Sequence, residues 1–403
     1  MADKYGTPLY VTDENRIRDN CRRFRGAFLK HLDSFKLSYA LKANSNIALL
    51  NVIRQEGCGA DCSCVPELQL ASMARFSSDA ILYTGSYNSD EELKYAINMG
   101  ATINLDDISI LGRLAKIGLP DILSFRINPG FGRGGHEKVM TAGPGAKFGM
   151  SERVALKAYE DAKRMGVERF GIHMMAGSSV LDPAYFAAVN DKLFEIASAI
   201  SRKVGIEFEF VDIGGGFGVP YRSDERVLDV ERLAREICSR FKRRFESQSC
   251  LPVLIAEPGR YIVCDSTVLL GRVHSVKRAD KTFIGTDIGM NILLRPALYD
   301  AYHEILVANR LDARRREKVD VVGQICESSD FLARDRLLPV VREGDVLAVL
   351  NAGAYGASMS SNYNSRPRAA EVLVKGGEDF LVREREDISD ILDRQRVPAR
   401  LLR

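Results

Sequence analysis

The stretch Phe208-Glu-Phe-Val-Asp-Ile-Gly-Gly-Gly-Phe-Gly218 decides the fold. Its first half is rich in strand-forming apolar residues, and its second half is a cluster of glycines, which marks the end of a strand. Further along, Val227–Phe245 carries apolar residues at helical spacing. The sequence therefore predicts a buried strand that ends in a glycine-rich loop and is followed by a helix.

The same order of strand and helix recurs on both sides of this stretch. Runs of strand character occur at Leu37–Ala43, Gly59–Ser63, Ile81–Gly85, Thr102–Leu105, Leu123–Asn128, Phe170–Met175, Phe208–Ile213 and Val253–Glu257. Helical spacing fills the intervals, as in Ile47–Gln55, Pro66–Arg75, Asp90–Asn98, Glu152–Met165 and Pro183–Val204. Eight such units are what a closed (β/α)8 barrel of the TIM type requires. An open doubly wound sheet shows the same alternation, because the number of strands alone does not establish closure.

The character of the sequence changes near Cys264. Runs rich in Val and Leu, separated by charged turns, replace the helical spacing: Thr267–Val276, Thr282–Thr286, Lys318–Val322, Val346–Leu350, Glu371–Lys375 and Asp379–Arg383. They predict a C-terminal, mostly antiparallel β domain, which Pro8–Thr12 is expected to join as an extra strand, and residues 387–403 are expected to form a short helix with a basic end. The predicted boundaries are 24–262 for the barrel and 1–23 with 263–403 for the β-rich domain.

Composition excludes several classes of protein. The chain has 403 residues, of which 46% are hydrophobic and 28% charged, so it can bury a large core. A net charge of +3 does not suggest a nucleic-acid or membrane partner, and no apolar run approaches the ~18 residues of a membrane span. The start of the chain lacks the apolar core of a signal peptide, and the eight scattered cysteines resemble free thiols, so we expect a cytoplasmic protein. The only cysteine cluster, Cys58, Cys62 and Cys64, lacks zinc spacing, so no metal is expected.

In a barrel, functional side chains gather at the carboxyl ends of the strands. The first strand ends in Tyr39-Ala-Leu-Lys42, and a lysine at such a position can form a Schiff base with an aldehyde, although it could also simply be salt-bridged or snorkelling. Gly214, Gly215 and Gly216 can expose backbone N–H groups to a phosphate, or they can merely form a tight turn. A dinucleotide fold is disfavoured, since no helix begins directly after these glycines.

Two further strand ends add polar groups. The eighth strand ends in Glu257-Pro-Gly-Arg260, and the sixth is followed by Gly177-Ser178. An arginine beside a glycine-rich loop suits a phosphate monoester, because its guanidinium pairs with oxyanions. A Schiff-base lysine, a phosphate cradle and a carboxylate that keeps a pyridine nitrogen protonated are together what pyridoxal 5'-phosphate (PLP) requires.

Five motifs carry a resemblance to the barrel-type PLP-dependent decarboxylases, the relatives of ornithine, arginine and diaminopimelate decarboxylases. They are YALKAN (39–44), DIGGGFG (212–218), AEPGRY (256–261), CESSD (326–330) and NAGAY (351–355). The resemblance implies an alanine-racemase-like barrel of PLP fold type III. Two longer stretches, at 294–303 and 355–368, are similar to the diaminopimelate branch, which implies decarboxylation of meso-2,6-diaminopimelate to L-lysine and CO2, the last step of lysine biosynthesis.

The resemblance also implies a role for each motif residue. Lys42 would form the internal aldimine and Glu257 would pair with the pyridine nitrogen, with Asp61 assisting near the ring. The phosphate would be surrounded by Gly214, Gly215, Gly216, Ser178, Gly259, Arg260 and Tyr355, of which Arg260 and Tyr355 would also touch substrate. Arg295, Tyr299 and Glu327 would bind the far end of the substrate, and Cys326 would protonate the α-carbon. Relatives form a homodimer in which the CESSD segment completes the neighbouring site.

One departure from the family pattern leaves alternatives open. The family usually has a histidine over the cofactor ring where this chain has Met175, and the preceding His173 is equally well a structural residue. A family decarboxylase acting on ornithine, lysine or arginine, a racemase on the same barrel, and a non-catalytic binding homologue are the other interpretations. Arg295 argues against lysine or ornithine as substrate, because neither would pair its guanidinium.

Overall fold

The structure is a computed structural model that describes residues 1–134, 142–175, 177–246 and 248–402. The chain divides into two compact units, one of residues Asn15–Val263 and one of Met1–Glu14 together with Cys264–Arg403. Among the described residues, no helix combines the length and the apolar character needed to cross a bilayer.

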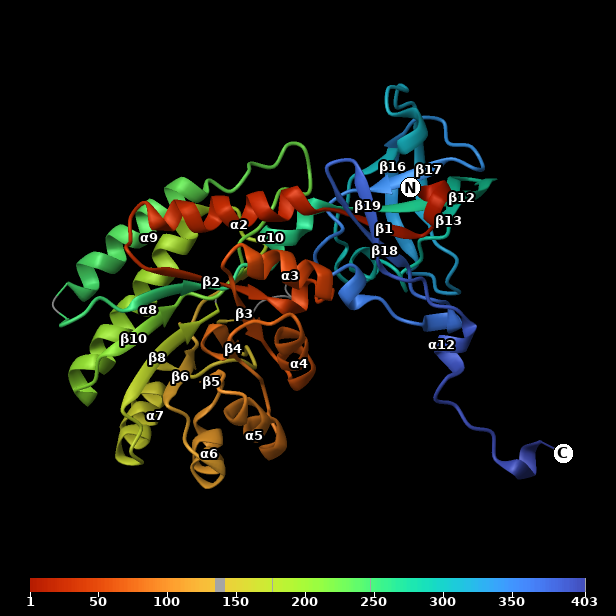
Figure 1. Ribbon diagram of the computed structural model, residues 1–403. Helices are drawn as coiled ribbons and strands as arrows, with labels where there is room; N and C mark the ends of the chain where they lie inside the picture. The colour runs from red at the N-terminus through yellow and green to blue at the C-terminus, as the bar shows by residue number, and fades with distance from the viewer. Residues whose placement is uncertain (135–141, 176, 247, 403) are drawn as a thin grey trace. The chain divides into compact units, whose positions relative to one another are not determined.

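The first unit is a closed barrel of parallel strands, which confirms the barrel over the open sheet (Figure 1). Its strands are β2 (Phe35–Ala40), β3 (Gly59–Cys62), β4 (Ile81–Tyr83), β5 (Thr102–Leu105), β6 (Ile122–Ile127), β8 (Arg169–Met174), β10 (Phe208–Asp212) and β11 (Val253–Ala256). β11 pairs with β2 through Leu254 and Phe35, and this pairing closes the ring. Two short strands, β7 (Arg133–Gly134) and β9 (Gly177–Ser178), pair outside the ring.

Helices cover the outer side of the barrel strands in Figure 1. They are α2 (Glu14–Leu29), α3 (Ile47–Gln55), α4 (Val65–Met73), α5 (Asp90–Asn98), α6 (Leu111–Ile117), α7 (Glu152–Arg164), α8 (Pro183–Val204), α9 (Val230–Phe245) and α10 (Arg260–Val263). Local signals fix the ends of the longest one: the Asp182 side chain accepts the Ala184 N–H, Pro183 begins α8, and Gly205 ends it in the left-handed conformation. The sequence analysis did not predict α2, α6 or α10.

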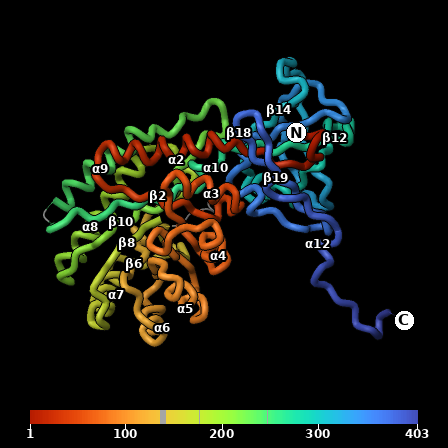
Figure 2. The backbone as a smooth tube through the Cα atoms, in the orientation of Figure 1, coloured from red at the N-terminus to blue at the C-terminus, as the bar shows by residue number. Residues whose placement is uncertain are grey.

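The second unit contains the N-terminal and C-terminal parts of the chain and is built around a mostly antiparallel sheet (Figure 2). Its elements are α1 (Ala2–Tyr5), β1 (Leu9–Asp13), β12 (Thr267–Arg278), β13 (Thr282–Thr286), α11 (Arg295–Tyr299), β14 (Ile305–Val307), β15 (Glu317–Val322), β16 (Phe331–Leu338), β17 (Val346–Val349), β18 (Ala370–Lys375), β19 (Glu378–Arg383) and α12 (Ile388–Leu392). As expected, the first strand joins this sheet, where β1 lies between β12 and β18. Two pairings, β1 with β18 and β13 with β15, are parallel.

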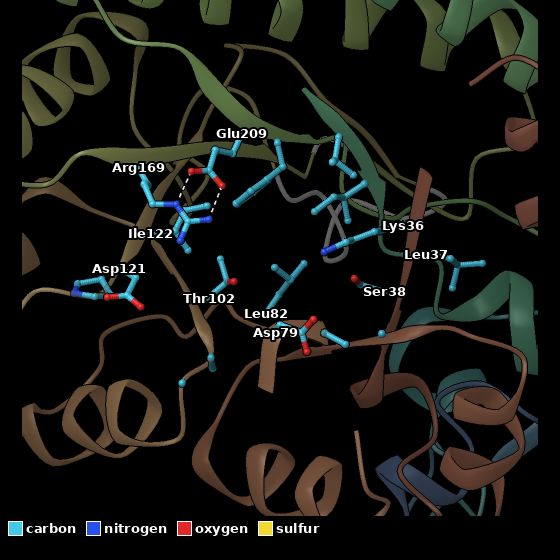
Figure 3. Close-up of a pocket in the computed structure, with 18 of the residues that line it drawn as sticks. Lys36, Leu37, Ser38, Asp79, Leu82, Thr102, Asp121, Ile122, Arg169 and Glu209 are labelled. Atoms are coloured by element: carbon cyan, nitrogen blue, oxygen red, sulfur yellow. Dashed lines mark hydrogen bonds and ion pairs between the residues drawn. The ribbon is translucent and has the colours of Figure 1, made fainter. Parts of the chain in front are cut away.

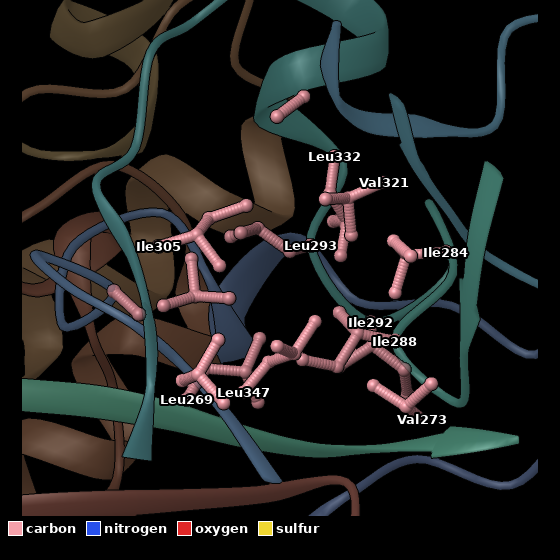
Figure 4. Close-up of a cluster of buried hydrophobic side chains, with 14 of the residues drawn as sticks. Leu269, Val273, Ile284, Ile288, Ile292, Leu293, Ile305, Val321, Leu332 and Leu347 are labelled. Carbon is pink, nitrogen blue, oxygen red and sulfur yellow. The ribbon is translucent and has the colours of Figure 1, made fainter. Parts of the chain in front are cut away.

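A compact apolar core holds this sheet together (Figure 4). Leu269 of β12, Ile284 of β13, Val321 of β15 and Leu347 of β17 are all fully buried within it. Burying a side chain of this size stabilises the fold by about 1.5–3 kcal/mol. The loops of this domain that carry the predicted substrate residues are therefore attached to a well-packed apolar core.

Side chains alternate along each barrel strand, so every second residue faces the interior. At the amino ends of the strands the interior opens into a cavity of about 540 Å³, which Lys36, Thr102 and Arg169 line (Figure 3). Arg169 pairs there with Glu209 of β10. The predicted functional residues instead follow the carboxyl ends, as barrels generally arrange them.

Candidate active site

Lys42 lies just beyond the carboxyl end of β2, in a short 3-10 turn, Leu41–Ala43. The turn is fixed from both sides, because Tyr39 donates its hydroxyl hydrogen to the Asn44 carbonyl oxygen, at 3.0 Å, and the Asn44 side chain accepts the Asn46 N–H. The apolar strand end predicts a desolvated lysine, but the Lys42 side chain is 44% exposed. The reason is that the turn carries Lys42 past the last buried residue of β2. Its ammonium group can therefore be reached from outside.

Asp61 of β3 is the carboxylate that faces Lys42. Lys42 Nζ lies 2.9 Å from Asp61 Oδ2, and the Asp61 side chain is only 2% exposed. Burial and the charge of Glu257 raise the pKa of Asp61 to about 6, against the opposing attraction of Lys42. Its second oxygen, Oδ1, is buried and has no hydrogen-bond partner among the described residues. An orphaned carboxylate oxygen beside a reactive amine indicates a place for a further polar group.

The glycines after β10 lie where no side chain fits. A Cβ atom on Gly215 would lie 2.4 Å from the Glu257 carbonyl oxygen, and one on Gly214 would lie 2.3 Å from the Met174 carbonyl oxygen. Gly214 and Gly216 also have φ angles of 66° and 95°, which favour glycine. These residues therefore bring bare backbone close to the carboxyl ends of β8, β10 and β11.

The loop that carries Ser178 is held against the same glycines. Val180 N–H donates to the Gly216 carbonyl at 3.0 Å, and Gly218 N–H donates to the Val180 carbonyl at 2.9 Å. These bonds interlock the loops after β8 and β10, so the half-buried Ser178 side chain lies on a segment fastened to the glycines. Hydrogen bonds between the two loops thus connect the segment that carries Ser178 to the predicted glycine cradle.

Gly259 and Arg260 follow the end of β11. A Cβ atom on Gly259 would lie 3.0 Å from the Ala43 Cβ, so the glycine lets this loop pack on the turn that carries Lys42. Arg260 begins α10, is 9% exposed, and donates to the Tyr221 hydroxyl from the loop after β10. The guanidinium therefore belongs to the same end of the barrel as the cradle.

Glu257 is buried and bonded to His173. His173 Nε2 lies 3.2 Å from Glu257 Oε2, and both side chains are nearly inaccessible. Burial alone would raise the pKa of Glu257, but the charge and hydrogen bond of His173, together with Lys42, lower it to about 2. Its other oxygen, Oε1, receives no N–H or hydroxyl hydrogen from the described residues. His173 and Lys42 thus favour the charged form of Glu257, and His173 is a positioning residue for it.

Met175 contacts the glycine cradle directly. Its Sδ atom accepts a hydrogen bond from the Gly215 N–H at 3.1 Å, and the side chain is half-buried. Thioether sulfur is a weak, polarisable acceptor that brings no charge. At this position the chain therefore offers an apolar, adaptable surface beside the cradle and no titrating ring.

The β domain brings the CESSD motif (326–330) into contact with the stretch 355–368. Cys326 Sγ accepts a hydrogen bond from Asn364 Nδ2 at 3.0 Å, and Glu327 accepts one from the Tyr363 hydroxyl. Asp330, which is buried, accepts the N–H groups of Met290 and Ile325 at 2.6 and 2.7 Å and so shapes the turn. Cys326 and Glu327 themselves are exposed.

Arg295 is held firmly at the start of α11. The residue is 6% exposed, and its Nη1 atom donates to His303 Nε2 at 2.8 Å. His303 is fully buried and donates from Nδ1 to the Leu350 carbonyl at 2.9 Å, which leaves Nε2 as the acceptor. Tyr299 ends α11 and is half-buried, as is Tyr355, which has a φ of 57°.

Three buried charged residues of the barrel escaped the sequence analysis: Asp212, Arg126 and Asp106. Arg126 of β6 lies 3.4 Å from the carboxylate of Asp106 and its guanidinium stacks on the Phe148 ring at 4.6 Å. Asp212 is the last residue of β10 and was quoted only as the first letter of the glycine motif. The available signal was the alternation along each strand, which places all three on the inward face.

The barrel residues fit the predicted cofactor in three respects. Lys42 supplies an accessible amine, the cradle presents backbone without side chains at the carboxyl ends of the strands, and the Oε1 atom of Glu257 is a buried oxygen with no assigned hydrogen bond. An amine, an anion site and a carboxylate are the groups that recognise an aldehyde, a phosphate and a pyridine nitrogen. The donor set is therefore the one that PLP needs.

Comparisons with known proteins agree with this chemistry. The family described as "Pyridoxal-dependent decarboxylase, pyridoxal binding domain" matches residues 14–264. The diaminopimelate decarboxylase of Methanothermobacter thermautotrophicus is 48% identical over 405 residues, which cover 100% of this chain and 95% of the relative.

Two solved structures are similar over nearly the whole chain. The crystal structure of diaminopimelate decarboxylase from M. jannaschii in co-complex with L-lysine has a TM-score of 0.92 at 35% identity and covers 99% of this chain and 94% of its own. The Helicobacter pylori enzyme complexed with L-lysine has a TM-score of 0.90 at 32% identity, with 97% of each chain covered. The similarity therefore extends over both units.

Proposed function

Because the chain belongs to the pyridoxal-dependent decarboxylases, we propose that it decarboxylates meso-2,6-diaminopimelate and releases L-lysine and CO2. The reaction is that of a PLP-dependent carboxy-lyase and is the last step of lysine biosynthesis. The observation that carries the proposal is the joint placement of Lys42, Asp61, Glu257 and the glycine cradle at one end of the barrel, in a chain that is 48% identical to a diaminopimelate decarboxylase.

PLP, when bound, supplies a conjugated ring that stabilises the negative charge left on the α-carbon after CO2 departs. Lys42 would hold the cofactor through its Nζ atom, and Asp61 would orient that amine through the 2.9 Å contact. Glu257, whose pKa is about 2, would keep a proton on the ring nitrogen, since a carboxylate this acidic does not take the proton for itself.

The phosphate end would be bound by Gly214, Gly215, Gly216, Ser178, Gly259 and Arg260, with Tyr355 adding its hydroxyl from the β domain. Interlocked loops support this proposal, because they fix the backbone of the cradle before any ligand arrives. A preorganised anion site binds without the cost of ordering its loops. Arg260 and Tyr355 would also touch the substrate.

The β domain would read the far end of the substrate. Arg295 offers a guanidinium that His303 holds in place, and such a fork pairs with a carboxylate through two hydrogen bonds. Glu327 would bind the distal ammonium group, with Tyr299 beside them. A substrate without the second carboxylate, such as lysine or ornithine, would offer the buried Arg295 no carboxylate to bind, and the site would discriminate against it.

Cys326 would deliver the proton that replaces CO2. The C–C bond to the carboxylate breaks, CO2 leaves, and the α-carbon takes a proton from the Sγ atom. Asn364 holds that sulfur through its 3.0 Å hydrogen bond, and positioned proton donors typically contribute 10²–10⁴-fold, on the order of several kcal/mol, to such a step.

We also propose that the enzyme is a homodimer with shared active sites. The exposure of Cys326 and Glu327 on the surface of the β domain supports this, because residues with catalytic roles need a partner surface to shield them from water. A cytoplasmic location is supported by the free state of all eight cysteines. Light scattering and cell fractionation test these two points.

A substrate panel tests the proposed function. Purified enzyme with PLP is incubated with meso-diaminopimelate, ornithine, lysine and arginine, and CO2 release is measured. We expect release from diaminopimelate alone. Release from ornithine, lysine or arginine without release from diaminopimelate would show that the substrate assignment is wrong.

A further inference from the structure

Asp212 has no part in the steps above, yet it lies at the centre of the site. It is the last residue of β10 and is 1% exposed. Polar atoms of Asp212, His173 of β8 and Glu257 lie within 4.8 Å of one another. The other charged groups that face this cluster are Asp61 of β3, Lys42 after β2 and Arg126 of β6.

Asp212 is bonded on two sides. Its Oδ1 atom accepts the Gly214 N–H at 2.8 Å, and its carboxyl group is in hydrogen-bond contact with the carboxyl group of Glu257. Glu257 N–H in turn donates to the Gly214 carbonyl at 2.7 Å. These three contacts form a closed ring that joins the first glycine of the cradle to the carboxylate meant for the ring nitrogen.

Two carboxyl groups can share a hydrogen bond only if one of them carries a proton. Glu257 has His173 at 3.2 Å and the charge of Lys42 to stabilise its ionised form. The charges that act most on Asp212 are those of Glu257 and Asp61, both negative, and together with its burial they raise the pKa of Asp212 well above its ordinary value. These surroundings favour a proton on Asp212 over one on Glu257.

We propose that Asp212 is a neutral carboxylic acid that donates its proton to Glu257 and accepts the Gly214 N–H, so that one side chain positions both ends of the cofactor site. Asp212 is thus a positioning residue and touches no reacting atom. The inference rests on the proposed function, because it takes Glu257 and the glycine cradle as the groups that hold PLP.

Asparagine is a sharp probe of this protonation state, since its amide donates and accepts as a neutral carboxyl does. In Asp212→Asn the amide oxygen can accept the Gly214 N–H while the amide N–H donates to Glu257. We expect this full-length variant to bind PLP within about threefold of wild type and to keep its visible absorbance spectrum, whereas Asp212→Ala loses both bonds and binds PLP about tenfold or more weakly.

Stability against pH gives a readout that needs neither substrate nor cofactor. A neutral Asp212 must hold its proton in the folded state at pH values where the unfolded chain has released it, so wild type loses stability as pH rises above about 4. Asparagine does not titrate, so Asp212→Asn should gain stability relative to wild type between pH 4.5 and pH 7.5, measured by denaturant unfolding of the full-length protein. Asp320→Asn is the control: Asp320 is equally buried but has Lys281 at 3.4 Å and the Asp335 N–H at 2.6 Å, so this variant should show no such gain.

An ionised Asp212 would give the opposite results. A tenfold loss of PLP affinity in Asp212→Asn, or a stability difference that does not grow with pH, would overturn the proposal. If Asp212→Ala does not fold, the two asparagine variants still decide the matter. Failure of the wild-type enzyme to decarboxylate diaminopimelate would refute the proposed function and leave the pH-dependent stability difference unaffected.

Discussion

Replacing Gly215 by alanine is expected to displace the cradle from Glu257. The added Cβ would lie 2.4 Å from the Glu257 carbonyl oxygen, whereas ordinary contact begins at 3.4 Å, so backbone must move by about 1 Å. No side-chain rotation can relieve this contact, since the backbone fixes the Cβ position and the carbonyl oxygen is itself main chain. Overpacking of this kind costs about 1–3 kcal/mol.

The expected losses differ between stability and activity. For a unit of the barrel's size, about 1–3 kcal/mol lowers the melting temperature by about 2–12 °C. A misplacement of about 1 Å in a binding loop can cost about 100-fold in turnover. Thermal denaturation of the cofactor-free protein measures the first effect, and PLP titration followed by CO2 release measures the second.

Gly112→Ala is the matched control, because Gly112 lies in α6 with no atom within 4 Å of its Cβ position. This variant should bind PLP normally and gain about 0.4–1 kcal/mol of stability. If Gly215→Ala has the melting temperature and the PLP affinity of wild type, the close approach of the cradle to Glu257 is not as described.

Four further predictions concern named side chains. Lys42→Ala should abolish turnover and remove the visible band of bound cofactor without lowering the melting temperature. Lys36→Ala, on β2 and in the cavity at the amino ends of the strands, should keep the turnover and the band; turnover in Lys42→Ala would contradict the role of Lys42. Arg295→Lys keeps the positive charge but loses the two-pronged guanidinium, so KM for diaminopimelate should rise about 10–100-fold. The control Arg278→Lys, on the surface of β12, should leave KM unchanged. An unchanged KM in Arg295→Lys would show that Arg295 does not bind the substrate. The pKa of Asp61 is raised to about 6, so the folded protein holds this proton more tightly than the unfolded chain does. Wild type should therefore lose up to about 3 kcal/mol of stability to denaturant as pH rises from about 4 to about 6, and Asp61→Asn should lack this loss. Equal pH profiles for the two proteins would contradict the burial of this carboxyl group. Mixing inactive Lys42→Ala subunits with Cys326→Ala subunits should restore part of the CO2 release if sites are shared, and no recovery above the sum of the separate variants would argue against shared sites.

The barrel could be predicted from sequence because each of its units carries a strong local signal. Thr102–Leu105, Ile47–Gln55 and Pro183–Val204 begin and end at the predicted residues. Helix α2 was missed because its sequence, rich in arginine and asparagine, shows only a narrow apolar face. β16 was missed because its outward residues are charged and its register is interrupted by bulges.

The candidate site shows a similar division. Lys42 and Glu257 stand out in sequence, since charged residues at the ends of apolar strands are costly without a reason. The ring that joins Asp212, Gly214 and Glu257 could not be predicted, because it depends on which strands become neighbours when the barrel closes. Equally, the half-exposed state of Lys42 depends on a one-turn 3-10 segment that the apolar pattern conceals.

The central claim is that the Lys42 amine, held by Asp61, carries the pyridoxal group. Borohydride reduction of the PLP-loaded protein, followed by peptide mass spectrometry, tests this claim most directly. We predict a single phosphopyridoxyl adduct on the peptide that contains residue 42. Modification of another lysine, or an unmodified peptide around residue 42, would contradict the account.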